Sequence, residues 1–317
     1  MTITDKFIQN FYTFISKKQQ SDYNFELNSA HRRVEKLLKH SLSENALVDF
    51  RNNNLADLQG AINFPDKHAG KFISRGMIKH YLATLLYLIK NKRRVKKQCK
   101  VLDQVFFDLQ ENKIGKPITY RLFNFNETGT NIYNNFYYSI IQKFLKNIEY
   151  TKILEIGGGF GKLCSIFKLN NRNLQYNIIE LPGESLIAYY YLEKLFSNNF
   201  VTNFVYKAND IETLSEDINI FSSTVISKDL KIFKDTDIVI NTQSFQHMNK
   251  QNINFYLDLF NENKIKYIIS INRHQPQFPD EVNFVNYFNN QGYKMTDSYK
   301  LDLIYLGLYL SLFKKDV

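Results

Sequence analysis

Residues 154–161 (Leu-Glu-Ile-Gly-Gly-Gly-Phe-Gly) combine a carboxylate with a cluster of glycines near the middle of the chain. The apolar residues Ile153, Leu154 and Ile156 predict a buried parallel strand, and residues 162–168 predict the first turns of a helix. A tight turn from a strand to a helix gathers backbone N–H groups and the positive end of the helix dipole at one point. We therefore expect a polar ligand at this turn, with a nucleotide as the expected class.

The spacing of the glycines argues against two common nucleotide motifs. Counted from Gly157 and Gly159, the third glycine of a dinucleotide fingerprint falls on Lys162. A phosphate-binding loop needs Ser or Thr after its lysine, and Leu163 stands there instead. What remains is the pattern Glu-x-Gly-x-Gly-x-Gly, formed by Glu155, Gly157, Gly159 and Gly161.

A second carboxylate follows at the offset expected for a nucleotide site. Residues 176–182 (Tyr-Asn-Ile-Ile-Glu-Leu-Pro) predict the next strand, with Glu180 at its carboxyl end. Glu180 lies 19 residues beyond Gly161, close to the roughly 20-residue offset at which an acid takes ribose hydroxyls in a βαβ unit. We expect Glu180 to bind the ribose of the nucleotide.

The third strand has two candidates, residues 200–206 and residues 218–226. With the first, Asp210 is placed to accept a hydrogen bond from an adenine amino group. With the second, that place goes to Ser222, Ser223 or Thr224. The sequence favours neither.

Two histidines follow later strands. Residues 238–240 predict a buried fourth strand, and the polar run after it contains His247. Residues 267–271 predict the fifth strand, followed by His274. Loops at the carboxyl ends of strands bind ligands in open α/β sheets, and histidine is suited to removing a proton near neutral pH. Residues 293–313 suit an antiparallel pair of strands at the sheet edge.

Charge divides the chain near Pro117. Residues 1–117 hold 21 Lys and Arg against 11 Asp and Glu, whereas residues 118–317 hold 20 of each. Helical spacing of apolar residues in the front part, including Phe7, Phe11 and Phe14, and a strongly apolar segment at 77–89 predict helices. We expect a helical N-terminal cap or substrate domain at 1–117 and a ligand-binding domain at 118–317.

The segment from Lys90 to Lys100 carries seven positive residues in eleven. A solvated helix end explains such a run, and so does a site that attracts phosphate, on a substrate or at an anionic membrane surface. Nucleic acid is disfavoured, because no aromatic residue lies inside the run and no recognition motif is visible.

Composition points to a soluble protein. No apolar run approaches the roughly 18 residues that span a bilayer, and the first residues lack the apolar segment of a signal peptide. Cys99 and Cys164 are too few for a disulfide framework or a cysteine-built metal site. We expect a cytoplasmic location.

With these motifs in view, residues 114–317 resemble the sugar O-methyltransferase family, within the class I methyltransferases that use S-adenosylmethionine. The resemblance is carried by residues 154–161, 180–182, 189–192 (Tyr-Tyr-Tyr-Leu), 240–248 (Ile-Asn-Thr-Gln-Ser-Phe-Gln-His-Met) and 271–273 (Ile-Asn-Arg). The chain departs from the family where His247 replaces a glutamate and Glu180 replaces an aspartate.

The resemblance implies a Rossmann-like α/β fold, with a mostly parallel sheet and an antiparallel C-terminal strand. It implies methyl transfer from S-adenosylmethionine, leaving S-adenosylhomocysteine, to a hydroxyl of a sugar or glycoconjugate that can carry phosphate. We expect His247 to be the catalytic base, with His274 as a second candidate. Expected cofactor-binding residues are Glu155, Gly157, Gly158, Gly159, Gly161, Glu180, Leu181, Asp210, Asn241 and Thr242.

We expect no metal, because Asn241 and Asn272 stand where some sugar methyltransferases place carboxylate ligands. Two other functions stay open. One is methylation of RNA or of a small molecule that is not a sugar, and the other is cofactor binding without catalysis.

Overall fold

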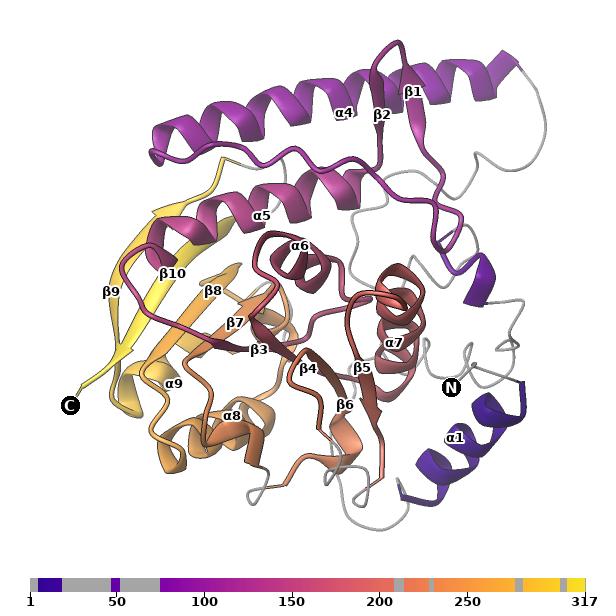
Figure 1. Ribbon diagram of the computed structural model, residues 1–317. Coiled ribbons are helices and arrows are strands. Elements are labelled where there is room, and N and C mark those ends of the chain that lie inside the picture. The colour runs from indigo at the N-terminus through magenta and orange to yellow at the C-terminus, as the bar shows by residue number, and fades with distance from the viewer. Residues whose placement is uncertain are drawn as a thin grey trace.

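The computed structural model describes residues 5–18, 47–51, 75–207, 214–227, 231–276, 282–302 and 307–316. A central sheet with helices on both faces dominates the molecule (Figure 1). Its strand order is β5-β6-β4-β3-β7-β8-β10-β9. The strands are β3 (Lys152–Ile156), β4 (Gln175–Glu180), β5 (Thr202–Val205), β6 (Ile218–Ser222), β7 (Ile238–Thr242), β8 (Tyr267–Arg273), β9 (Tyr293–Lys300) and β10 (Leu308–Lys315).

Neighbouring strands from β5 to β8 pair in parallel, and β10 is antiparallel to both β8 and β9. The prediction of a Rossmann-like, mostly parallel sheet with an antiparallel C-terminal strand is confirmed. The predicted terminal pair corresponds to β9 and β10.

The third strand is resolved by its pairing. β6 pairs in parallel with β4, and Ser222 lies opposite Glu180 in the register. Residues 218–226 therefore supply the strand next to β4, and residues 200–206 supply β5, which pairs with β6 at the outer edge. Asp210 lies outside the described residues.

Each face of the sheet has its own hydrophobic core, because successive side chains of a strand point to opposite faces. On β3, Ile153 belongs to the core under α5 (Gly129–Leu145), α6 (Lys162–Asn170) and α7 (Pro182–Phe196). Leu154 and Ile156 belong to the core under α8 (Lys250–Glu262) and α9 (Phe284–Asn290). Both layers are visible in Figure 1.

The front of the chain adds elements on either side of this frame. α4 (Arg75–Val101) packs on α5 as an outer layer, with the short hairpin of β1 (Tyr120–Leu122) and β2 (Phe125–Glu127) beside it (Figure 1). The helix predicted at 77–89 is confirmed and extends to Val101, through the basic run. The sequence did not predict the hairpin. The spacing of Val34, Leu37 and Leu38 also predicts a helix, and Pro65 and Gly70 predict a loop at 63–70. Both segments lie outside the described residues.

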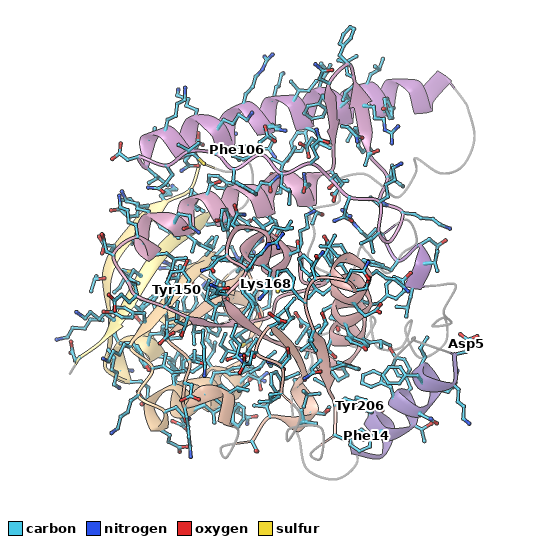
Figure 2. The ribbon with its side chains drawn as sticks, viewed as in Figure 1. Asp5, Phe14, Phe106, Tyr150, Lys168 and Tyr206 are labelled. Carbon is cyan, nitrogen blue, oxygen red and sulfur yellow. The ribbon has the colours of Figure 1, made fainter. Side chains whose placement is uncertain are left out.

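α1 (Asp5–Lys18) covers the outer edge of the sheet at β5. Its Phe11 ring lies 5.3 Å from the Phe204 ring of β5. Its Phe14 ring lies 5.8 Å from the Tyr206 ring, and Figure 2 labels both residues. The predicted helical spacing of Phe7, Phe11 and Phe14 is confirmed, since all three contact this edge.

Within the described ranges, no helix combines the length and the apolar character needed to cross a bilayer.

Candidate functional site

The glycine segment forms the loop between β3 and α6. Gly157 and Gly161 have φ angles of 76° and 82°, a left-handed conformation that side chains with a Cβ adopt only at a cost. A Cβ on Gly157 would overlap the Ser244 hydroxyl, and a Cβ on Gly161 would lie 2.7 Å from Leu192. The loop therefore needs glycine at both positions.

Glu180, at the end of β4, faces this loop. Its Oε2 accepts a hydrogen bond of 2.6 Å from the Gly159 N–H, and its Oε1 accepts one of 2.8 Å from the Leu181 N–H. The Gly157 N–H donates to the Ile179 carbonyl at 2.8 Å, which fixes the loop to β4. The structure thus brings together the glycines and the acid that the sequence singled out.

Hydroxyls lie beside Glu180 at the end of β6. Ser222 and Thr224 are buried, and their hydroxyl oxygens are 2.9 Å apart. Ser223 begins the 3-10 helix η4 (Ser223–Val225). These are the residues that the sequence placed near an adenine if residues 218–226 formed the third strand.

Glu155 lies buried beneath the loop. The Tyr176 hydroxyl donates to its Oε2 at 3.0 Å, while its Oε1 is buried without a hydrogen-bond partner in the described part of the chain. Burial raises the pKa of Glu155 to about 8, the hydrogen bond from Tyr176 opposes this shift, and the charge of Glu180 adds to it. Near neutral pH the carboxyl group is therefore mostly protonated.

The loop after β7 passes directly beside the glycine loop. Asn241 donates from Nδ2 to the Ile156 carbonyl at 2.7 Å, and Ser244 contacts the position where Gly157 would carry a Cβ. Ile156 and Gly157 begin the glycine loop. The glycine segment (154–161) and the segment 240–248 therefore lie side by side in the structure.

Asn241 and Asn272 form a buried amide pair at the ends of β7 and β8. Asn272 Nδ2 donates to Asn241 Oδ1 at 2.8 Å, and the same oxygen accepts from the Phe245 N–H at 2.9 Å. Both side chains are fully buried. The amide pair holds the ends of β7 and β8 together and fixes the loop after β7. Thr242, the last residue of β7, is half-buried.

Gln243 has a φ of 61°, which is uncommon for a residue with a side chain. Its N–H donates to the Ile271 carbonyl at 2.8 Å, and its Nε2 donates to the Tyr137 hydroxyl at 2.7 Å. A residue other than glycine in the left-handed conformation costs about 1–3 kcal/mol of conformational free energy, and such residues cluster at functional sites. The sequence did not single out Gln243 as a site residue, because backbone strain has no sequence signal.

His247 is exposed at the end of the 3-10 helix η6 (Phe245–His247). Its Nε2 lies 3.1 Å from Gln246 Nε2, and Gln246 Oε1 accepts from the Arg273 N–H at 2.9 Å. The ring therefore lies exposed at the rim of the β7 loop, the place that the sequence predicted.

His274 occupies a more enclosed place after β8. Its ring stacks on Tyr309 with centroids 4.2 Å apart, and its Nε2 lies 2.9 Å from the Ser311 hydroxyl oxygen. Burial lowers its pKa. The contacts of His274 with Tyr309 and Ser311 of β10 are compatible with a structural role and with a role in proton transfer.

A buried ion cluster fixes the other side of the glycine loop. Glu111 binds Lys162, which follows Gly161, at 2.9 Å and Arg51 at 2.6 Å, and the Thr128 hydroxyl donates to it at 2.5 Å. Burial alone would raise the pKa of Glu111, but the charges of Arg51 and Lys162 outweigh it and lower the pKa to about 2. The cluster thus joins the front of the chain to the loop.

The residues at this edge match the polar groups of a nucleoside. A carboxylate is a natural acceptor for ribose hydroxyls, and the buried hydroxyls of β6 and η4 lie beside it. Oε1 of Glu155, which has no partner among the described residues, is a further hydrogen-bonding group under the loop. Among the residues that the structure describes, no group of His, Cys, Asp and Glu is arranged to hold a metal ion.

Comparison with protein-family models and with curated proteins found no match. Among solved structures, the chain is similar to the methyltransferase domain of bacterial CtHen1 (17% identity over 55% of this chain and 95% of that one, TM-score 0.37). It is also similar to a SAM-dependent methyltransferase from Aquifex aeolicus (14% identity, 54% and 87%, TM-score 0.38). A third is magnesium protoporphyrin IX methyltransferase from Synechocystis PCC 6803 with bound SAH (8% identity, 56% and 78%, TM-score 0.38). With identities this low, a function for the chain has to rest on the chemistry of its own residues.

Proposed function

We propose that the chain is an O-methyltransferase that transfers a methyl group from S-adenosylmethionine to a hydroxyl of a sugar. The observation that carries this proposal is the meeting of the glycine loop with Glu180 on one side and with the β7 loop on the other. The glycine loop and Glu180 suit binding of a nucleoside. The neighbouring β7 loop carries His247 as an exposed base.

The groups proposed to hold the cofactor come from several strand ends. Glu180 binds the ribose hydroxyls, Ser222 or Thr224 lies at the adenine, and the backbone from Gly157 to Gly161 lies along the amino-acid part. Glu155, Leu181, Asn241 and Thr242 complete the proposed set. The cofactor, when bound, supplies an electrophilic methyl group.

The remaining work of the protein is alignment and proton removal. Methyl transfer to a hydroxyl is an in-line displacement, so holding the reacting atoms in line can supply roughly 7–11 kcal/mol of the barrier. The β7 loop, anchored by hydrogen bonds of Asn241 and Gln246, positions His247 at the rim. His247 removes the hydroxyl proton, a step worth about 10²–10⁴-fold in rate.

The choice of a sugar as acceptor rests on the resemblance of residues 240–248 to the sugar O-methyltransferase family. A sugar offers several hydroxyls, and the exposed position of His247 leaves room for a large, polar acceptor. A nucleotide-linked sugar or a glycan precursor satisfies both conditions.

A methyl-transfer assay tests this proposal. The full chain is incubated with methyl-labelled S-adenosylmethionine and a panel of nucleotide sugars and polysaccharide fractions, with small RNAs alongside. We expect label in a sugar, and we expect His247→Gln to lower the turnover number by about 10²–10⁴-fold at saturating cofactor. A chelator arm tests metal independence.

Cofactor binding by the variant serves as the control for folding and should match the wild type. Unchanged turnover in His247→Gln would contradict the assignment of the base, and His274→Gln would then be the variant to test. Label in RNA and in no sugar would contradict the proposed acceptor.

A further inference from the structure

The outward side of α4 carries a stripe of exposed residues whose character changes along the helix. Its first members are apolar, with Leu82 49% exposed and Leu86 56% exposed. Its later members are the exposed cations Lys90, Arg93, Lys97 and Lys100. Spacings of three and four residues place all of these on one side of a helix, opposite the buried Leu85, Leu88 and Val95.

The cations of the stripe differ from their neighbours in the same basic run. Lys92 and Lys96 both pair with Asp108, and Arg94 pairs with Asp302. The four stripe cations make no ion pair with any residue that the structure describes. Their charges are therefore available to an external partner.

The β1–β2 hairpin adds an apolar tip to this side. The Arg121 N–H donates to the Tyr81 hydroxyl at 2.8 Å, and Lys92 pairs with Glu127 at 2.5 Å, so the hairpin lies against α4 between these points. Its turn projects past α4 on the side away from the sheet (Figure 1). At the turn, Phe123 is 97% exposed.

Packing within the chain does not explain Phe123. Its φ of 50° is a left-handed conformation that costs a residue with a side chain about 1–2 kcal/mol. The neighbouring Leu122 is also exposed, at 43%. A single exposed apolar residue is ordinary, but here a phenylalanine and a leucine share a projecting turn beside exposed leucines and exposed cations.

We propose that this α4 face, made of Leu82, Leu86, Lys90, Arg93, Lys97, Lys100, Leu122 and Phe123, docks on the surface of an anionic lipid bilayer. Anionic headgroups attract the cations, and the apolar tip enters the boundary between headgroups and acyl chains. The excess of positive charge in residues 1–117, with 21 Lys and Arg against 11 Asp and Glu, acts in the same direction.

A bilayer fits this face better than a nucleic acid does. Single-stranded nucleic acids bind where aromatic rings stack on bases along a basic groove. Phe123 is the one aromatic residue of the α4 face, and its exposed leucines offer no stacking surface. Aliphatic side chains, in contrast, gain from leaving water for the lipid interface. The inference is independent of the proposed methyl transfer.

Sedimentation with vesicles tests it directly. We expect the full chain to bind vesicles of phosphatidylcholine mixed with phosphatidylglycerol, and not vesicles of phosphatidylcholine alone. Raising NaCl from roughly 0.1 M to roughly 0.5 M should release most of the protein, because the Debye length shortens. Each cation near the surface is worth roughly fivefold in affinity, so Lys90→Gln/Arg93→Gln/Lys97→Gln should bind roughly a hundredfold more weakly.

Two matched variants keep the result specific. Phe123→Ser should weaken binding at every salt concentration, since it removes an apolar contact. Lys264→Gln/Lys266→Gln/Lys314→Gln removes as many exposed cations outside the α4 face and should bind like the wild type. Equal loss in both triple variants would reduce the effect to net charge and overturn the proposal. Absence of vesicle binding, or binding to RNA alone, would also overturn it.

Discussion

At the scale of single residues, Glu155 is the least ordinary group of the site. It is buried beneath the glycine loop, one oxygen is held by Tyr176, and its pKa is raised to about 8. A ligand with positive charge near this oxygen would favour the ionised form, so binding of a sulfonium cofactor would be linked to release of a proton from Glu155.

The raised pKa predicts how folding stability depends on pH. In the folded protein Glu155 keeps its proton up to about pH 8, whereas an unfolded glutamate releases it near its ordinary pKa of 4.5. The stabilisation is therefore complete below pH 4.5 and is lost as the pH rises through 8, with a slope of about 1.4 kcal/mol per pH unit.

Glu155→Gln removes the titrating group and keeps an acceptor for Tyr176. We expect the decline of the unfolding free energy between pH 5 and pH 8 to become shallower in the variant, as measured by urea unfolding at several pH values. A decline as steep as that of the wild type would show that Glu155 does not carry the retained proton.

At the scale of elements, the Glu111 cluster joins three segments that are distant in sequence. Glu111 binds Arg51 at a separation of 60 residues and Lys162 at a separation of 51. The same carboxylate accepts from Thr128, whose side chain caps α5 by accepting from the Asn131 N–H. The cluster therefore sets the starts of both α5 and α6, and with them one side of the glycine loop.

Glu111→Gln leaves two buried cations without their carboxylate, a change that costs about 3–5 kcal/mol in comparable buried pairs. Because the folded pKa is lowered to about 2, the wild type holds this stabilisation above the ordinary pKa of 4.5 and loses it as the pH falls through 2. Urea unfolding should show the loss at pH 7 and a weaker dependence on pH below 4.5. Asp235→Asn, which breaks an exposed pair with Lys152, should cost under about 1 kcal/mol. Equal effects of both substitutions would contradict the account.

The buried strands β3 and β4 could be predicted from sequence because each is a short apolar run with a clear end. β3 stops at the glycines that begin with Gly157, and β4 ends at Glu180. The choice between residues 200–206 and 218–226 could not be made, because both are apolar and pairing with β4 is a tertiary contact.

Other features left no local signal. The β1–β2 hairpin turns at Phe123 without a glycine, so the usual turn pattern is missing. The contacts of Glu111 with Arg51 and Lys162 join residues that no spacing rule relates. The roles of Asn241 and Gln246 in holding the β7 loop likewise depend on contacts across strand ends.

At the scale of the whole molecule, the two parts of the chain share one core. α4 and α5 lie on opposite sides of the boundary predicted near Pro117, yet Asn91 of α4 donates to the Tyr133 hydroxyl of α5 at 2.5 Å. α1 also joins this core, because Phe11 and Phe14 pack on Phe204 and Tyr206 beside β5. The boundary itself stays a prediction.

Phe11→Ala tests the docking of α1. Phe11 is fully buried and contacts Phe204 and Tyr206, so its removal should cost about 3–5 kcal/mol, limited by the free energy that holds α1 in place. Limited proteolysis should cut the variant faster within α1. Phe123→Ala, at a residue that is 97% exposed, should stay within about 0.5 kcal/mol of the wild type. Equal proteolysis of Phe11→Ala and the wild type would show that α1 is not held by this contact.

The central claim, that the glycine loop and Glu180 form a nucleoside site, is tested most directly by calorimetric titration with S-adenosylhomocysteine. We expect the wild type to bind. Glu180→Gln should bind roughly 10–100-fold more weakly, because it loses charged hydrogen bonds. Glu193→Gln, in the helix α7 that follows Glu180, should bind like the wild type. No heat with the wild type, or equal affinities of Glu180→Gln and the wild type, would contradict the claim.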